Sequence, residues 1–219
     1  MKIVTLTCPS WAGDLPPALS DVPAHAVAER PGKDDVDALT SESTRIVVAG
    51  TDADLAAVAL RLLRKERLAQ VELAYLPTSP DSAVADVWGL PTNPDAAATL
   101  AVRGDPDAVP LVRDDNGGVL LGRGELRPLR GVVYCDDDLV LRGGARRLEV
   151  TPLAPVGVDV RVVRPGLLGS RVRASSGRAV QIGCLATLVV SDGVPHPRPV
   201  TRWTWYKHTE PLRLVRGLH

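Results

Sequence analysis

The chain has 219 residues, 45% of them hydrophobic, enough for one large domain or two small ones with cores of their own. Acidic and basic residues balance at 26 each, so the total charge gives no support for a nucleic-acid partner or an anionic membrane. No apolar run reaches the length of a membrane span, and no secretory signal is recognisable. Three isolated cysteines without CxxC spacing argue against a disulfide framework or a zinc site. We therefore expect a cytoplasmic protein without a transmembrane segment.

The charge is unevenly distributed along the chain. Residues 1–110 carry 16 acidic and 9 basic residues, a net charge of −7, and the remainder carries +7. This split indicates two modules or electrostatic docking between them, although chance and a solvated surface explain it equally well. The absence of Phe and the abundance of Ala, Val, Leu and Arg are typical of bacteria with GC-rich genomes.

Strands and helices alternate in the first half. The pattern predicts strands at Lys2–Leu6, Arg45–Ala49 and Val71–Leu76, and helices that begin near Asp54, at Ser82–Val87 and at Asp95–Val102. Asp54 is the expected N-cap of the first of these helices. Alternation of this kind predicts a Rossmann-like parallel α/β domain over residues 1–105.

Short strands separated by glycine turns dominate the second half. We expect strands at 119–121, 131–134, 139–141, 147–150, 158–163, 178–183, 185–190 and 211–216. This spacing predicts a β-sandwich-like domain over residues 106–219. Trp203, Trp205 and Tyr206 are expected on one strand, with the two tryptophans on the same face. They form either an aromatic anchor in the core, with Arg202 and Lys207 on the wet side, or an exposed surface for a partner.

Two spaced motifs resemble the catalytic domain of diacylglycerol kinases, which shares its fold with NAD kinases. That family has a strand followed by Gly-Gly-Asp-Gly-Thr and a helix; here Gly50-Thr51-Asp52-Ala53-Asp54 follows a strand. About twenty residues later, the family has Leu-Pro-Leu-Gly-Thr-Gly-Asn-Asp and then Gly-Leu-Pro. Here Leu76-Pro77-Thr78-Ser79-Pro80-Asp81-Ser82-Ala83 is followed by Gly89-Leu90-Pro91. The resemblance implies an α/β domain followed by a β-sandwich domain, and nucleotide-binding loops at these two motifs.

The chemistry of the motifs departs from the family. Phosphate-binding loops need glycine, because the backbone must reach positive φ and approach the phosphates with no Cβ in the way. Here Thr51, Ala53, Ser79 and Asp81 stand where the family has glycine, and Asp54 stands where it has threonine. The residues assigned to a nucleotide site by the resemblance are therefore Gly50, Thr51, Asp52, Asp54, Ser79 and Asp81, in a degenerate form.

The family's catalytic Asp-Gly-Glu motif is also incomplete. Val180–Cys184 aligns with it but has neither acidic residue, whereas Asp192-Gly193-Val194 has the Asp and lacks the Glu. Asp192 is thus the one candidate for a general base.

Acidic clusters elsewhere have simpler explanations than metal binding. Asp52, Asp54 and Asp81 could chelate Mg²⁺, although helix capping and a loop role account for them better. Asp136–Asp138 and Asp114–Gly118 have the composition of turns between strands. No metal ligand is assigned.

Three functions remain open. The first is a non-catalytic member of the lipid-kinase fold that acts as a binding or regulatory protein. The second is an active ATP-dependent lipid or small-molecule kinase with a phosphate site rebuilt from Asp52, Asp54 and Asp81. The third is a purely structural or interaction protein. ATP and Mg²⁺ are the cofactors that the resemblance implies. The sequence leaves open whether the partner is a protein, a small molecule or a lipid, and it leaves self-association open as well.

Overall fold

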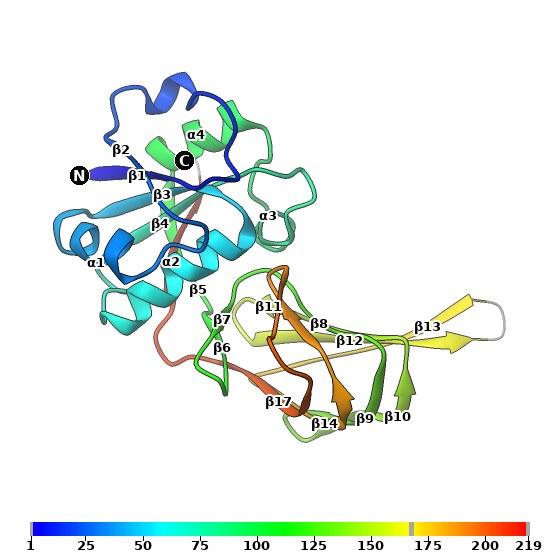
Figure 1. Cartoon of the computed structure of the whole chain (residues 1–219). Helices are drawn as coiled ribbons and strands as arrows, with labels where there is room; N and C mark the ends of the chain where they lie inside the picture. The colour runs from blue at the N-terminus through cyan, green and yellow to red at the C-terminus, as the bar shows by residue number, and fades with distance from the viewer. Residues whose placement is uncertain (1, 167–168, 218–219) are drawn as a thin grey trace. The chain divides into compact units, whose positions relative to one another are not determined.

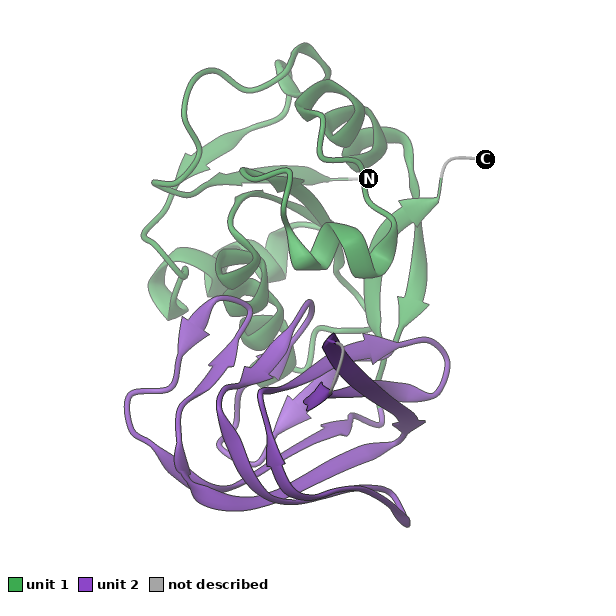
Figure 2. Cartoon of the chain, turned by 90° about the vertical axis from the view of Figure 1, so that its right-hand side faces the viewer, with its two compact units in different colours: residues 1–109, 210–219 green, residues 110–209 purple. Residues whose placement is uncertain are grey.

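The structure is a computed structural model that describes residues 2–166 and 169–217, and the chain divides into two compact units. Unit 1 comprises residues 1–109 and 210–219, and unit 2 comprises residues 110–209 (Figure 2). The division confirms the predicted combination of an α/β region and an all-β region. Unit 2 begins at residue 110, whereas the sequence analysis placed the boundary between residues 105 and 106, and the end of the chain belongs to unit 1.

Unit 1 is built on one six-stranded sheet with the order β2-β1-β3-β4-β18-β5 (Figure 1). Its strands are β1 (Ile3–Thr7), β2 (Ala24–Ala26), β3 (Arg45–Gly50), β4 (Glu72–Pro77), β5 (Asp105–Val109) and β18 (Leu212–Gly217). Neighbouring strands from β2 to β18 run parallel, and β5 is antiparallel to β18. All six residues of β3 are buried, as expected for a central parallel strand.

The helices of unit 1 are a 3₁₀ turn at Pro17–Leu19, α1 (Lys33–Glu42), α2 (Asp52–Arg64), α3 (Ala83–Trp88) and α4 (Pro94–Arg103). The last three are those predicted, whereas the periodicity did not indicate α1. That helix buries only Val36 and Thr40, so its apolar stripe is short, but Asp34 and Asp35 in its first turn suit the helix dipole. No helix in the described part of the chain is long and apolar enough to cross a membrane.

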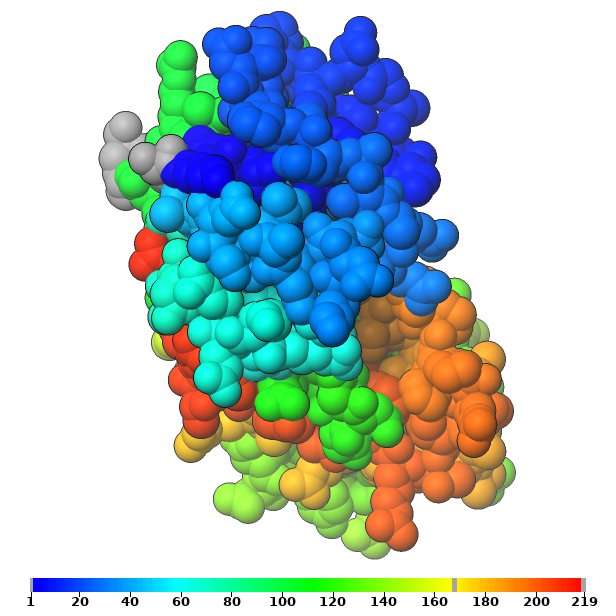
Figure 3. Space-filling model, turned by 60° about the vertical axis from the view of Figure 1, so that its left-hand side comes forward, coloured from blue at the N-terminus to red at the C-terminus, as the bar shows by residue number. Residues whose placement is uncertain are grey.

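The assignment of the last strand to the second domain was wrong. β18 pairs with β4 in parallel and with β5 in antiparallel fashion, so the chain returns to the first sheet after it has built unit 2. The physical reason is burial: Leu212, Leu214 and Val215 are covered in unit 1, and Arg213 donates to Glu72 of β4 at 2.7 Å. In the space-filling view, the red C-terminal residues lie at the surface beside the cyan segment that precedes β4 (Figure 3).

Unit 2 consists of two six-stranded sheets, here called sheet B and sheet C. Sheet B has the order β10-β9-β14-β17-β6-β7, and sheet C has the order β13-β12-β11-β8-β15-β16. The strands of sheet B are β6 (Val112–Asp114), β7 (Val119–Leu120), β9 (Leu129–Cys135), β10 (Asp138–Ala145), β14 (Ala179–Thr187) and β17 (Val200–Lys207). The strands of sheet C are β8 (Gly124–Leu126), β11 (Arg147–Leu153), β12 (Gly157–Gly166), β13 (Gly169–Gly177), β15 (Val189–Ser191) and β16 (Val194–Pro195). The strand pairings described within these two sheets are antiparallel, as predicted.

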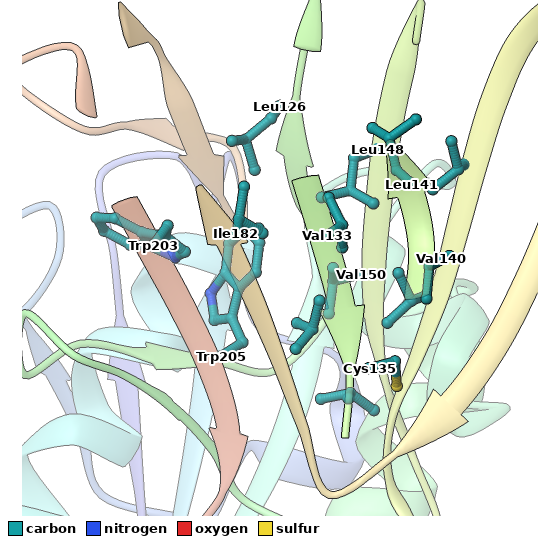
Figure 4. Close-up of a cluster of buried hydrophobic side chains, with 14 of the residues drawn as sticks. Leu126, Val133, Cys135, Val140, Leu141, Leu148, Val150, Ile182, Trp203 and Trp205 are labelled. Carbon is teal, nitrogen blue, oxygen red and sulfur yellow. The ribbon is translucent and has the colours of Figure 1, made fainter. Parts of the chain in front are cut away.

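The tryptophans of β17 anchor the core of unit 2. Trp203 and Trp205 are 2% and 0% exposed, and their ring centroids lie 5.8 Å apart in an edge-on arrangement. Figure 4 shows both indoles among the buried aliphatic side chains, near Ile182 and Leu126. Arg202 is exposed and Lys207 is partly exposed. Of the two alternatives left open by the sequence, the core anchor is confirmed.

Candidate functional site

The two motifs of the predicted nucleotide site lie side by side in unit 1. Gly50, the last residue of β3, pairs with Pro77, the last residue of β4, and the Thr78 amide donates to the Gly50 carbonyl at 3.0 Å. Ligands of open α/β sheets bind beyond the carboxyl ends of the strands. The two motifs thus lie at the carboxyl ends of neighbouring strands.

Asp54 lies in the first turn of α2 and is completely buried. Its Oδ2 accepts from the Thr51 amide and hydroxyl, both at 2.8 Å, and from the Ser10 hydroxyl at 3.2 Å, while Oδ1 accepts from the Arg30 amide at 2.7 Å. The N-cap of α2 is Thr51, and the expectation that Asp54 would be the N-cap was wrong by three residues. Asp54 is the reciprocal member of the capping box, because its carboxylate accepts from the backbone of the N-cap.

The Asp54 carboxylate also explains why position 50 is glycine, as in the family motif. A Cβ at Gly50 would lie 2.7 Å from Oδ2 of Asp54 and 3.1 Å from Cβ of Cys8. Glycine is thus required here by the close packing of the chain's own side chains. Burial, with Asp54 beside it, raises the pKa of the Cys8 thiol to about 12. Cys8 is accordingly a neutral thiol near pH 7 and has none of the character of a nucleophile.

Asp52 connects the two motifs. Its Oδ1 accepts from the Tyr75 hydroxyl at 2.8 Å and from the Ser82 hydroxyl at 2.5 Å, and its Oδ2 accepts from the amides of Ala83 and Val84 at 2.8 and 3.3 Å. Burial, and then the charge of Asp52, raises the pKa of Tyr75 far above its usual value, so the phenol remains a donor. The carboxylate thus accepts from the amides in the first turn of α3, where the helix dipole and N–H groups without a partner inside the helix favour an anion.

The remaining predicted residues contribute little to a binding site. Ser79 and Asp81 are exposed, and the Ser79 hydroxyl accepts from the Asp81 amide at 3.1 Å. Asp52, Asp54 and Asp81 do not converge, because the first two are engaged by different segments and the third faces solvent. Among the described residues, no group of three His, Cys, Asp or Glu side chains could hold a metal ion.

Asp192, the candidate base, lies in unit 2 and forms a hairpin turn. Its carboxylate accepts from the amides of Leu121, Gly122 and Arg123 at 2.7 to 3.0 Å, and it is 5% exposed. Asp192 and Gly193 both have positive φ, +47° and +82°, in the two-residue loop between β15 and β16. Asp-Gly is the sequence preferred by such a turn, so the dipeptide was a signal from which the turn could have been predicted, although the sequence analysis assigned Asp192 as a candidate base.

The other acidic clusters are also turns, as predicted. Asp114 Oδ1 accepts from the amides of Asn116 and Gly118 at 2.9 and 2.8 Å, within the connection from β6 to β7. Asp136 accepts from the amides of Arg178 and Ala179 at 2.9 Å, in the turn from β9 to β10. Aspartate carboxylates that accept from backbone N–H groups thus recur at the turns of this chain.

Replacing Asp192 tests its structural role. Alanine removes the acceptor of three amides and is strained at positive φ, so we expect Asp192→Ala to lower the free energy of unfolding of unit 2 by about 3 kcal/mol. Asp192→Asn keeps one acceptor oxygen and tolerates this φ, so its cost should be no more than about half as large. Chemical denaturation of both variants measures the difference. An Asp192→Ala protein as stable as the parent would contradict this assignment.

Comparison with known proteins supports the fold. The chain is similar to a putative diacylglycerol kinase from Bacillus anthracis, with 14% identity, 99% of this chain and 97% of that chain covered, and a TM-score of 0.75. A second structure of a putative diacylglycerol kinase from the same organism matches with 15% identity, the same coverage and a TM-score of 0.73. An NAD kinase from Archaeoglobus fulgidus in complex with ATP matches with 14% identity, 98% and 94% coverage, and a TM-score of 0.60. No family model and no curated protein sequence matches the chain. The chain therefore has the two-domain fold of diacylglycerol kinase-like and NAD kinase proteins.

Proposed function

We propose that this chain is a non-catalytic member of the lipid-kinase fold that acts as a binding or regulatory protein. The observation that carries the proposal is that Asp54, which stands where the family has threonine, is a fully buried internal anion, and that Asp52 is a second internal anion. The Asp52 carboxylate holds the amides of Ala83 and Val84 at the start of α3, beside the loop that would otherwise approach a phosphate. A nucleotide phosphate would have to displace a carboxylate that accepts four hydrogen bonds.

The residues present do not fit ATP and Mg²⁺. Side chains at Thr51, Ala53 and Asp81 stand where a phosphate cradle needs bare backbone, and Pro80 supplies no amide donor. The Asp54 carboxylate would repel a phosphate. It is buried beside Cys8 and already accepts hydrogen bonds from Thr51, Ser10 and Arg30. Phosphoryl transfer depends on positioning and on charge stabilisation, and each lost group commonly costs about 10²-fold or more.

A turnover assay tests the proposal. We expect no ATP-dependent phosphorylation of diacylglycerol in mixed micelles, or of NAD, above the level of a blank without protein. Calorimetry should show no low-micromolar affinity for Mg-ATP. The similar solved structures are putative diacylglycerol kinases and an NAD kinase in complex with ATP, which makes these two acceptors the reasonable probes.

The rebuilt-site alternative is tested with Asp81. Because this side chain is exposed, Asp81→Asn removes its charge without a cost in folding, and Asp86→Asn, exposed on α3, is the matched control. Turnover in the parent protein that Asp81→Asn abolishes and Asp86→Asn retains would overturn our proposal and establish an active kinase with a rebuilt site. Absence of turnover together with a thermal shift by lipid or nucleotide would favour the binding protein over a purely structural role.

A further inference from the structure

The outer face of sheet B carries exposed arginines among apolar side chains. Leu129, Val133 and Cys135 of β9 are buried in the core of unit 2, so the alternating residues Arg130 and Val132, with Tyr134 after them, face outward. The register places further residues beside these, because Arg142 of β10 pairs with Val132, Val132 pairs with Gly183 of β14, and Gly183 pairs with Arg202 of β17. Arg142 and Arg202 therefore flank Val132 in one row across four strands.

Leu185 completes this patch at the end nearer Arg130. It follows Gly183 by two positions on β14, and the neighbouring pair Cys184 with Gly131 places it opposite Arg130. Leu185 is 65% exposed, the largest fraction among the large apolar side chains that the structure describes. We call Arg130, Arg142, Arg202, Val132, Tyr134 and Leu185 the basic face.

The arginines of the basic face have no acidic partner within ion-pair distance in the described part of the chain. The outer face of sheet C differs in this respect, since Arg127, Arg147 and Arg161 lie 3.5, 3.2 and 3.0 Å from Glu125, Glu149 and Asp159. In the turn beyond Tyr134, the Asp136 carboxylate accepts from two backbone amides and Asp138 pairs with Arg173 at 2.9 Å. Unit 2 as a whole has 15 basic and 9 acidic residues, so its net charge is +6.

We propose that the basic face docks on the surface of an anionic phospholipid bilayer. Guanidinium groups bind phosphate in a bidentate manner, and three of them without carboxylates beside them form a surface complementary to anionic headgroups. Leu185 and Tyr134 supply the apolar contact, since aliphatic side chains enter the acyl region and Tyr favours the interface. Single-stranded nucleic acid is bound by stacking on aromatic rings, and the most exposed apolar side chain here is aliphatic.

The test is co-sedimentation of the full chain with vesicles. Vesicles of phosphatidylcholine with about one third phosphatidylglycerol should bind the protein at 50 mM salt, and vesicles of phosphatidylcholine alone should not. Binding should weaken as salt is raised, because the attraction falls off within a Debye length. The triple variant Arg130→Gln/Arg142→Gln/Arg202→Gln should partition about 100-fold more weakly, from roughly a fivefold loss for each arginine near a charged surface.

A second triple variant provides the matched control. Arg127→Gln/Arg147→Gln/Arg161→Gln changes the net charge by the same amount on the other sheet, and it should lose much less binding. Leu185→Ser should weaken binding in the parent while leaving the melting temperature unchanged. Equal losses in the two triple variants, no binding to phosphatidylglycerol vesicles, or tighter binding to a single-stranded oligonucleotide than to vesicles would overturn the proposal. The outcome is independent of the turnover assay, because neither triple variant touches unit 1.

Discussion

Replacing Trp205 with alanine should lower the free energy of unfolding of unit 2 by about 3–5 kcal/mol. The indole is fully buried, it packs edge-on against Trp203, and it fills the space between the two sheets (Figure 4). Thr204, which is partly exposed between them on the other side of β17, serves as the control, and Thr204→Ala should cost far less. Urea denaturation followed by circular dichroism measures both. A loss no larger than that of Thr204→Ala would mean that Trp205 does not anchor the core.

Gly124 provides a sharper form of the same experiment. A Cβ at this position would lie 2.6 Å from the ring of Trp205, so Gly124→Ala should destabilise the parent protein. In a Trp205→Leu background the ring is absent, and Gly124→Ala should cost much less. This coupling is expected for residues in contact. Strictly additive losses would contradict the contact between Gly124 of β8 and Trp205 of β17.

Replacing Arg45 with methionine should lower the free energy of unfolding of unit 1 by about 3–5 kcal/mol, because it removes a buried guanidinium from Glu72 and from three backbone carbonyls. Arg45 is 3% exposed and donates to Glu72 at 2.8 Å and to the carbonyls of Ala101, Val102 and Gly104 at 2.8 to 3.1 Å. It thereby places a cation at the C-terminal end of α4, which suits the helix dipole.

Arg61 is the matched control for Arg45. It forms a two-point ion pair with Asp37, at 2.9 and 2.7 Å, but both side chains are 15% exposed. Arg61→Met should cost clearly less, since solvent screens partly exposed pairs. Equal losses for the two variants would show that burial of Arg45 is not what makes its pair important. Thermal or chemical denaturation of both proteins gives the comparison.

The Arg45 network also predicts how unit 1 responds to acid. Burial alone would raise the pKa of Glu72, but hydrogen bonds from Arg213 and Arg45 outweigh it and hold that pKa below its usual value. A carboxyl with a lowered pKa stabilises the folded state above its unfolded pKa of about 4.3, and this contribution is lost as the pH falls through the folded value. Glu72→Gln should flatten that part of the stability profile between pH 5 and roughly pH 3. An unchanged profile would contradict the lowered pKa.

The sequence by itself determined the fold class and the position of the two motifs. The apolar run at the centre of β3 is typical of a strand buried in a parallel sheet, and glycine turns between short strands are typical of antiparallel sheets. The alternation around Trp203 and Trp205 placed both indoles on one face, since a strand has a period of two. These inferences succeeded because each depends only on the types and spacing of a few neighbouring residues.

Only the tertiary structure decided what the acidic residues do. Asp52 accepts from residues about 30 positions later in the chain, Asp54 accepts from Arg30 in an earlier loop, and Asp192 accepts from a loop about 70 positions away. A carboxylate has the same composition whether it binds a metal, acts as a base or holds backbone amides, and the choice depends on which donors the fold brings to it. The same reason explains the place of β18 in the first sheet. The residues that bury it and pair with it, including Glu72 of β4, lie far from it in the sequence.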